Sequence, residues 1–208
     1  MKMFVVICFG MLLGVSGLEL PVATWYAQQM SQNPILTKSM TAATVFAASD
    51  ITAQRIEGQK KLDKVRLLMT TAIGGLYFAP AAHFWYNGVT AILPLSTIPH
   101  IIGKAALGQL FFGPLVTCVF FAAACLQTKQ NLFKKVKRDL IPVQLAGIGY
   151  WPFVDLISFS LIPIDYIPVF INFASFIWTI FLSYKARRGL QVAVEEDEAN
   201  KQRSRKIR

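Results

Sequence analysis

The sequence predicts an all-α membrane protein, a multi-spanning transmembrane helical bundle with kinked, proline-interrupted helices. The chain has 208 residues, of which 54% are hydrophobic and only 15% are charged. Its mean hydropathy of +0.47 is higher than in ordinary soluble domains. The chain also offers four or five apolar stretches of roughly the 20 residues that a spanning helix needs. Pro80 and Pro114 interrupt two of these stretches, and we expect them to kink those helices near mid-depth.

The N-terminal segment, residues 1–17, has two interpretations. One early lysine, Lys2, precedes a short apolar run and small residues, a pattern typical of a cleavable secretory signal; a mature chain would then begin near Leu18. The alternative is a retained membrane helix, which Gly10 and Gly14 favour because they form a G-x-x-x-G pair. The predicted domains are a signal-like or anchor segment (1–17), a membrane helical bundle (18–188) and a charged C-terminal tail (189–208).

The number of core spans depends on the last two apolar runs, 143–162 and 164–184. They form either two spans with a tight turn or one broken element. With two spans, one side of the membrane would hold 18 of the 21 Lys and Arg residues, namely five in 55–66, five in 129–138 and eight in the tail. The positive-inside rule therefore favours five core spans over four. We also expect residues 129–138 to form a short interfacial helix.

Several classes of function are not supported by the sequence. The formal net charge is +10, but the basic residues cluster beside apolar stretches, which suits anionic lipid headgroups better than nucleic acid. No phosphate-binding glycine loop, H-E-x-x-H pair or G-x-S-x-G motif occurs, and the three cysteines lack metal-ligand spacing. We therefore expect no enzyme, no catalytic residues, no metal and no cofactor. The expected partners are the lipid bilayer and small solutes, and a homo-oligomer is left open.

Polar and ionisable side chains inside the apolar stretches are the candidate site residues, since each is costly in a bilayer unless it is paired or hydrated. The candidates for a pore or polar pathway are Asp50, Gln54, His83, Lys104, Gln109 and Asp155. Either these residues form a polar pathway through the bundle, or they make interhelical hydrogen bonds that lock the packing. We expect Asp50 and Asp155 to be coupled to a cation near mid-depth, with Lys104 or His83 as the nearest candidates.

Four ordered motifs resemble those of one protein family. Asp50 and Gln54 are similar to its first-span pattern, and the residues around Pro80 resemble its G-x-x-x-[GA]-P-x-x-H-x-W-Y stretch. Lys104 and Gln109 resemble its third-span pattern. The family-motif residues in the second span and the C-terminal signature are Pro80, Trp85, Tyr86, Trp151, Pro152, Pro163 and Trp178. The family is that of the 22-kilodalton peroxisomal membrane protein and its inner mitochondrial membrane relatives.

The resemblance implies an integral protein of the peroxisomal or inner mitochondrial membrane. For several family members it further implies a weakly selective pore for small metabolites and a role in organelle homeostasis. Broken helices with polar groups at mid-depth favour such a channel. The alternative is a non-conducting scaffold that stabilises other membrane complexes, and a dry bundle without a cavity would favour it.

This chain departs from the family pattern in ways that affect both selectivity and location. Asp155 stands where the pattern usually has Gln, and Ile167 stands where it commonly has Arg. Gaining a carboxylate and losing a cation predicts a lumen that favours cations more than in relatives. The signal-like N-terminus is also atypical, so an endomembrane or plastid location stays open.

Overall fold

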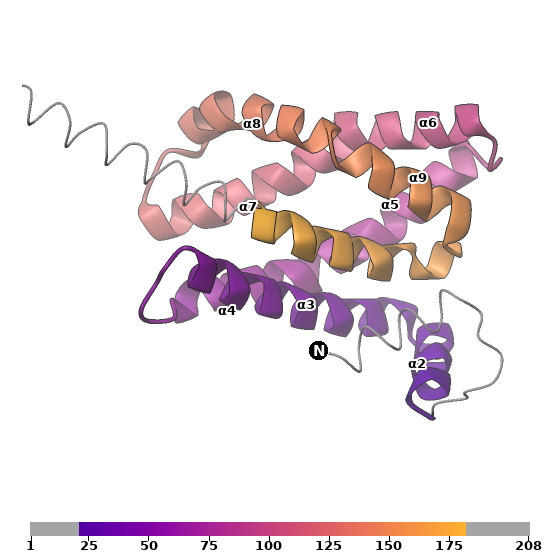
Figure 1. Cartoon of the computed structure of the whole chain (residues 1–208), viewed down its shortest axis with the longest axis horizontal. Helices are drawn as coiled ribbons and strands as arrows, with labels where there is room; N and C mark the ends of the chain where they lie inside the picture. Colours follow the sequence, from indigo (N-terminus) through magenta and orange to yellow (C-terminus); the bar gives the residue numbers. More distant parts are fainter. Residues whose placement is uncertain (1–20, 182–208) are drawn as a thin grey trace, which may run out of the picture.

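The structure is a computed structural model that describes residues 21–181, and the described residues form a helical bundle without strands (Figure 1). The all-α prediction is confirmed. In chain order the elements are α2 (Pro21–Gln32), α3 (Pro34–Ile56), α4 (Lys64–Ala72), η1 (Ile73–Phe78), α5 (Ala79–Ile92), α6 (Ile98–Leu107), η2 (Gly108–Phe112), α7 (Gly113–Thr128), α8 (Leu132–Ile148), α9 (Trp151–Leu161) and η3 (Ile164–Tyr166). The turn η3 opens the C-terminal helix, Ile164–Phe181. The signal-like segment 1–17 and the tail 189–208 lie outside the described residues.

Three of the described helical stretches are long and apolar enough to cross a membrane, namely Lys64–Ile92, Ile98–Gln127 and Ile164–Phe181. A fourth candidate is the pair α8 and α9, which meets the same test as one span bent by 52°. The helix α3 has 23 residues and would reach about 35 Å at 1.5 Å per residue. It is long enough to span but more polar than the others, and it packs along α4 and η1.

Two of the three basic segments, 55–66 and 129–138, lie together at one end of the bundle; the third, the tail, lies outside the described residues. The α3–α4 loop and the α7–α8 loop share that end, whereas the α5–α6 connection and the turn before the C-terminal helix lie at the other (Figure 1). This placement agrees with the orientation that the charge distribution predicts. The expected short interfacial helix at 129–138 is not separate: residues 132–138 are the first part of the longer helix α8. Asn131 caps it by accepting a 3.0 Å hydrogen bond from the backbone N–H of Lys134.

The two interruptions predicted at Pro80 and Pro114 are π-helical segments. Each segment, η1 or η2, is followed directly by an α-helix whose first turn contains the proline. A proline in a first turn is well tolerated, and a π-turn absorbs an extra residue within a helix. Residues 74–80 (GGLYFAP) and 108–114 (GQLFFGP) share the pattern Gly-x-Leu-aromatic-Phe-small-Pro. The two spans therefore repeat one local structure in opposite directions.

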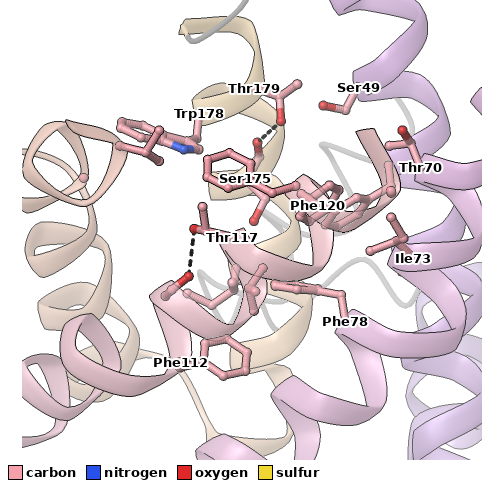
Figure 2. A pocket seen from close by; sticks show the side chains of 18 of the residues that line it. Ser49, Thr70, Ile73, Phe78, Phe112, Thr117, Phe120, Ser175, Trp178 and Thr179 are labelled. Carbon is pink, nitrogen blue, oxygen red and sulfur yellow. Dashed lines mark hydrogen bonds between the residues drawn. The ribbon is translucent and has the colours of Figure 1, made fainter. Parts of the chain in front are cut away.

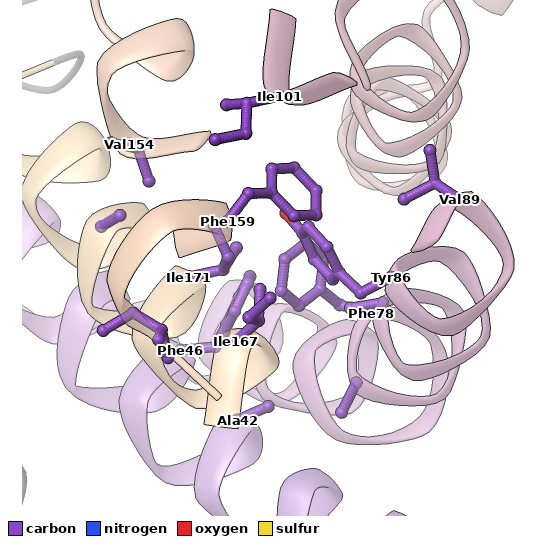
Figure 3. Packing of buried hydrophobic residues seen from close by; sticks show 14 residues of the cluster. Ala42, Phe46, Phe78, Tyr86, Val89, Ile101, Val154, Phe159, Ile167 and Ile171 are labelled. Atoms are coloured by element: carbon purple, nitrogen blue, oxygen red, sulfur yellow. The ribbon is translucent and has the colours of Figure 1, made fainter. Parts of the chain in front are cut away.

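The core lies where the two repeated segments meet the C-terminal helices (Figure 3). Phe78 and Phe112 occupy equivalent positions in the repeat, and their ring centroids are 6.0 Å apart. Tyr86 continues this contact to Phe159, at 5.6 Å between centroids. Packing of rings and small residues, more than apolar burial, stabilises helix contacts in lipid. These aromatic contacts therefore fix how α5, η2 and α9 sit against one another.

Candidate solute cavity

A cavity of about 590 Å³ lies inside the described bundle. Side chains from α3, α4, η1, η2, α7 and the C-terminal helix point toward it (Figure 2), and residues of α5, α8 and α9 complete its wall. Its volume falls within the range of roughly 300–1,000 Å³ that is typical of small-molecule sites. Most of the lining is apolar or aromatic. Of the predicted pathway residues, Asp50, Gln109 and Asp155 line it.

One end of the cavity is built around Arg66, near the α3–α4 loop. Its Nε donates to Oδ1 of Asp50 at 2.8 Å, and its Nη1 and Nη2 donate to the two carboxylate oxygens of Glu57 at 2.6 and 3.0 Å. Asp50 is buried, whereas Arg66 and Glu57 are partly exposed. Because these exposed groups also line the cavity, the cavity reaches the surface here. We call this group the mouth cluster.

Gln54 supports the mouth cluster from behind and does not line the cavity. Its Nε2 donates to Oδ2 of Asp50 at 2.7 Å, and its Oε1 accepts from the backbone N–H of Asp63 at 2.7 Å. Asp63 in turn caps α4 through its contact with the backbone N–H of Arg66. Gln54 therefore holds the α3–α4 loop in the position that brings Arg66 to Asp50.

A polar strip runs along the wall that α7 and α8 form. Gln144 Nε2 donates to Thr117 Oγ1 at 3.1 Å, and Thr117 Oγ1 donates to the carbonyl of Gly113 at 2.8 Å. A Cβ atom at Gly113 would lie only 3.1 Å from Gln144 Oε1. The absence of a side chain at Gly113 thus lets this glutamine reach across to α7 beside Gln109.

Asp155 lies at the other end of the cavity, one helical turn after Trp151 on α9. Its side chain is 6% exposed, and Oδ2 is 3.5 Å from the position that a Cβ at Gly108 would take. Among residues 21–181 no hydrogen bond or ion pair to Asp155 is present. Its carboxylate therefore lines the cavity without a hydrogen bond or a cation from the described chain, and the buried side chain of Tyr86 lies close enough to interact with it electrostatically.

A second polar cluster lies outside the cavity, toward the opposite end of α3. The side chain of Lys38 is fully buried; its Nζ is 3.0 Å from His83 Nδ1 and 3.9 Å from Asp165 Oδ1. An ammonium group only donates, so Nδ1 of His83 accepts. His83 is thus bound to Lys38 and not to either of the aspartates that line the cavity.

Lys104 is also buried but separate from both groups. Its Nζ lies 4.9 Å from the centroid of the Phe159 ring, a cation–π distance, and it does not line the cavity. The expectation that Lys104 or His83 would be coupled to Asp50 and Asp155 is wrong: Arg66 pairs with Asp50, and within residues 21–181 no cation pairs with Asp155. The six predicted pathway residues therefore do not form one continuous path in this structure.

The aromatic residues of the family motifs form much of the cavity wall. Trp85 stacks on Phe112 with centroids 5.3 Å apart, and Trp151 meets Trp178 at 6.0 Å. Tyr86 packs between Phe112 and Phe159. Three motif prolines mark helix starts: Pro80 and Pro152 stand in the first turns of α5 and α9, and Pro163 precedes η3.

Sequence reasoning missed four polar residues that the structure singles out. Lys38 and Arg66 supply the cations for the two clusters. Ser49 Oγ and Gln127 Nε2 are buried cavity-lining atoms that lack a hydrogen-bond partner within the described part of the chain. A lysine inside an apolar stretch is itself a signal, but Lys38 stands near the start of its predicted span, where lysines commonly reach the headgroups.

A bundle with at least three candidate spans, in contact with the bilayer and hollow inside, defines a multi-spanning membrane protein with an internal cavity. Residues 124–183 match the Mpv17 / PMP22 family. "Protein SYM1" of Gibberella zeae is 30% identical over 165 residues, which cover 77% of this chain and 94% of that protein. The chain therefore belongs to the Mpv17 / PMP22 family.

Other relatives point to organelle membranes. "Peroxisomal membrane protein PMP22" of Arabidopsis thaliana is 26% identical over 78% of this chain and 88% of its own length. "Mitochondrial inner membrane protein Mpv17" of Caenorhabditis briggsae is 24% identical over 76% and 89%. No solved structure matches the chain. The protein is thus an integral organelle-membrane protein.

Proposed function

We propose that the protein allows small solutes to permeate an organelle membrane through its cavity, with weak selectivity, and so contributes to organelle membrane homeostasis. The cavity of about 590 Å³ with polar groups at both ends carries this proposal. A scaffold needs no such space, because protein interiors otherwise pack with few voids. The role is transport and not catalysis, and the peroxisomal and inner mitochondrial relatives favour one of those two membranes.

In this proposal the structure corresponds to a state that opens to the surface at the mouth cluster. Phe78, Tyr86 and Phe112 line the cavity. Phe78 and Tyr86 belong to the buried cluster that continues to Phe159 and Ile167 (Figure 3), and Phe112 packs against that cluster. Passage requires these side chains to move apart. The π-helical segments η1 and η2 carry Phe78 and Phe112, and such segments are frequent where a helix must change shape.

The test is flux from liposomes that contain the purified full-length protein, with neutral solutes of increasing size. We expect release of small solutes and a size limit. Ser175→Trp should reduce release because Ser175 lines the cavity (Figure 2). Thr44→Trp is the matched control, since Thr44 is exposed on α3 and does not line the cavity. Absence of release from wild-type protein would favour the scaffold instead.

A further inference from the structure

The charge of the cavity is opposite in sign to that of the chain. Its lining contains three carboxylates, Asp50, Glu57 and Asp155, and one guanidinium, Arg66, with no lysine or histidine. The formal charge of the lining is therefore −2, although the whole chain carries +10. Arg66 is already bound to Asp50 and Glu57, so no cation of the lining is left for Asp155.

Aromatic residues that line the cavity lie next to Asp155 on its own helix and on the element that packs against it. Trp151 precedes it by one turn on α9, and Gly108, against which Oδ2 rests, precedes Phe112 by one turn on η2. Trp85 is stacked on Phe112. Aromatic faces attract cations, and a buried carboxylate without a partner is costly until a cation or a proton reaches it.

We propose that this end of the cavity is a binding site for a small organic cation, such as an amine or a quaternary ammonium compound, with Asp155 as its counter-ion. The proposal deepens the proposed function, on which its role in permeation rests. Inorganic cations fit less well, since they need several oxygen ligands in place of their water and the wall near Asp155 is mostly aromatic.

The test uses choline and its neutral carbon isostere 3,3-dimethyl-1-butanol as probes for the purified full-length protein. Trp85, Trp151 and Trp178 line the cavity, so tryptophan fluorescence should report binding, and calorimetry gives Kd. We expect choline to bind at least about tenfold more tightly than the isostere, because only choline carries the charge. Equal affinity for the two probes, or no binding of choline, would overturn the proposal.

Asp155→Asn should weaken choline binding by about tenfold or more and leave the affinity for the isostere unchanged. Asp165→Asn is the matched control, because it also removes one carboxylate but lies outside the cavity with its side chain 65% exposed. Wild-type choline affinity in a folded Asp155→Asn protein would contradict the site.

The outcomes also separate the cation site from the proposed permeation. Choline binding without solute release would refute permeation alone, and release of neutral solutes without choline binding would refute only the cation site.

Discussion

Arg66 Nε and Asp50 Oδ1 are 2.8 Å apart and join α4 to the buried face of α3, sixteen residues earlier in the chain. The carboxylate of Asp50 is 3% exposed and also accepts a hydrogen bond from Gln54. Both of its oxygens are therefore bound by side chains of the protein. Asp155 differs from Asp50, because no cation of residues 21–181 pairs with its carboxylate. Both aspartates stand inside apolar stretches of the sequence, but only Asp50 is paired with a cation of the described chain. The two therefore have different roles.

Removing Arg66 should destabilise the fold. In Arg66→Gln the buried carboxylate of Asp50 loses its cation, and breaking a buried pair costs about 2 to 5 kcal/mol. Thermal unfolding in detergent measures the change. Arg138→Gln is the control, since Arg138 forms an exposed ion pair with Asp139 and solvent screens such pairs, so we expect unfolding close to that of wild type. Adding Asp50→Asn to Arg66→Gln should recover part of the loss; no recovery would show that Arg66 acts through packing alone.

The Lys38 cluster makes a separate prediction about which partner matters. His83→Phe removes the acceptor for a fully buried ammonium, so we expect a loss of about 1.5 to 3 kcal/mol in unfolding free energy. Asp165→Asn should cost less than about 1 kcal/mol, because its side chain is exposed and 3.9 Å from Lys38. Chemical unfolding of both variants decides the order. A larger effect at Asp165 would mean that the ion pair, and not the histidine, holds Lys38.

Gly74 should tolerate no side chain. A Cβ there would lie 2.7 Å from Phe46 Cγ, so Gly74→Ala forces η1 away from α3 and should cost about 1 to 3 kcal/mol. Gly88 on α5 offers the control, because nothing lies within 4 Å of a Cβ at that position. Gly88→Ala should leave stability unchanged or raise it by up to about 1 kcal/mol. Equal effects of the two substitutions on thermal unfolding would argue against the close α3–η1 packing.

The sequence predicts part of this arrangement, and the residues show why it does not predict all of it. Asp50 and Asp155 stand out because carboxylates are rare in apolar stretches. Arg66 does not stand out, since it lies in a basic segment and the sequence does not distinguish it from the solvent-exposed lysines beside it. Lys38 is close to a predicted span end, where lysines commonly reach the headgroups. Pro80 and Pro114 predict interruptions, but hydropathy does not distinguish a kink from a π-helical segment.

Cysteine accessibility tests the shared side of the basic loops. In a protein without its native cysteines, Lys60→Cys and Lys135→Cys should be labelled from the same face of the membrane, because both loops lie at one end of the bundle (Figure 1). Ser96→Cys, in the exposed connection between α5 and α6, should be labelled from the other face. The tail position Ala199, outside the described residues, is predicted to follow Lys60. Opposite protection of Lys60→Cys and Lys135→Cys would contradict the topology.

The contact between Phe78 and Phe112 should limit permeation. Phe112→Ala removes a ring that lines the cavity, packs against Phe78 and stacks on Trp85, so in liposomes we expect faster solute release and a larger size limit. The same change creates a void and should cost about 3 to 5 kcal/mol. Phe112→Leu retains more volume and therefore provides a second variant if the alanine protein does not fold. Phe153→Ala is the control, because Phe153 is an exposed phenylalanine on α9 that does not line the cavity, and its release should match wild type. If folded Phe112→Ala protein releases solutes at the wild-type rate and with the wild-type size limit, the barrier lies elsewhere along the bundle and the repeated π-helical segments serve packing rather than passage.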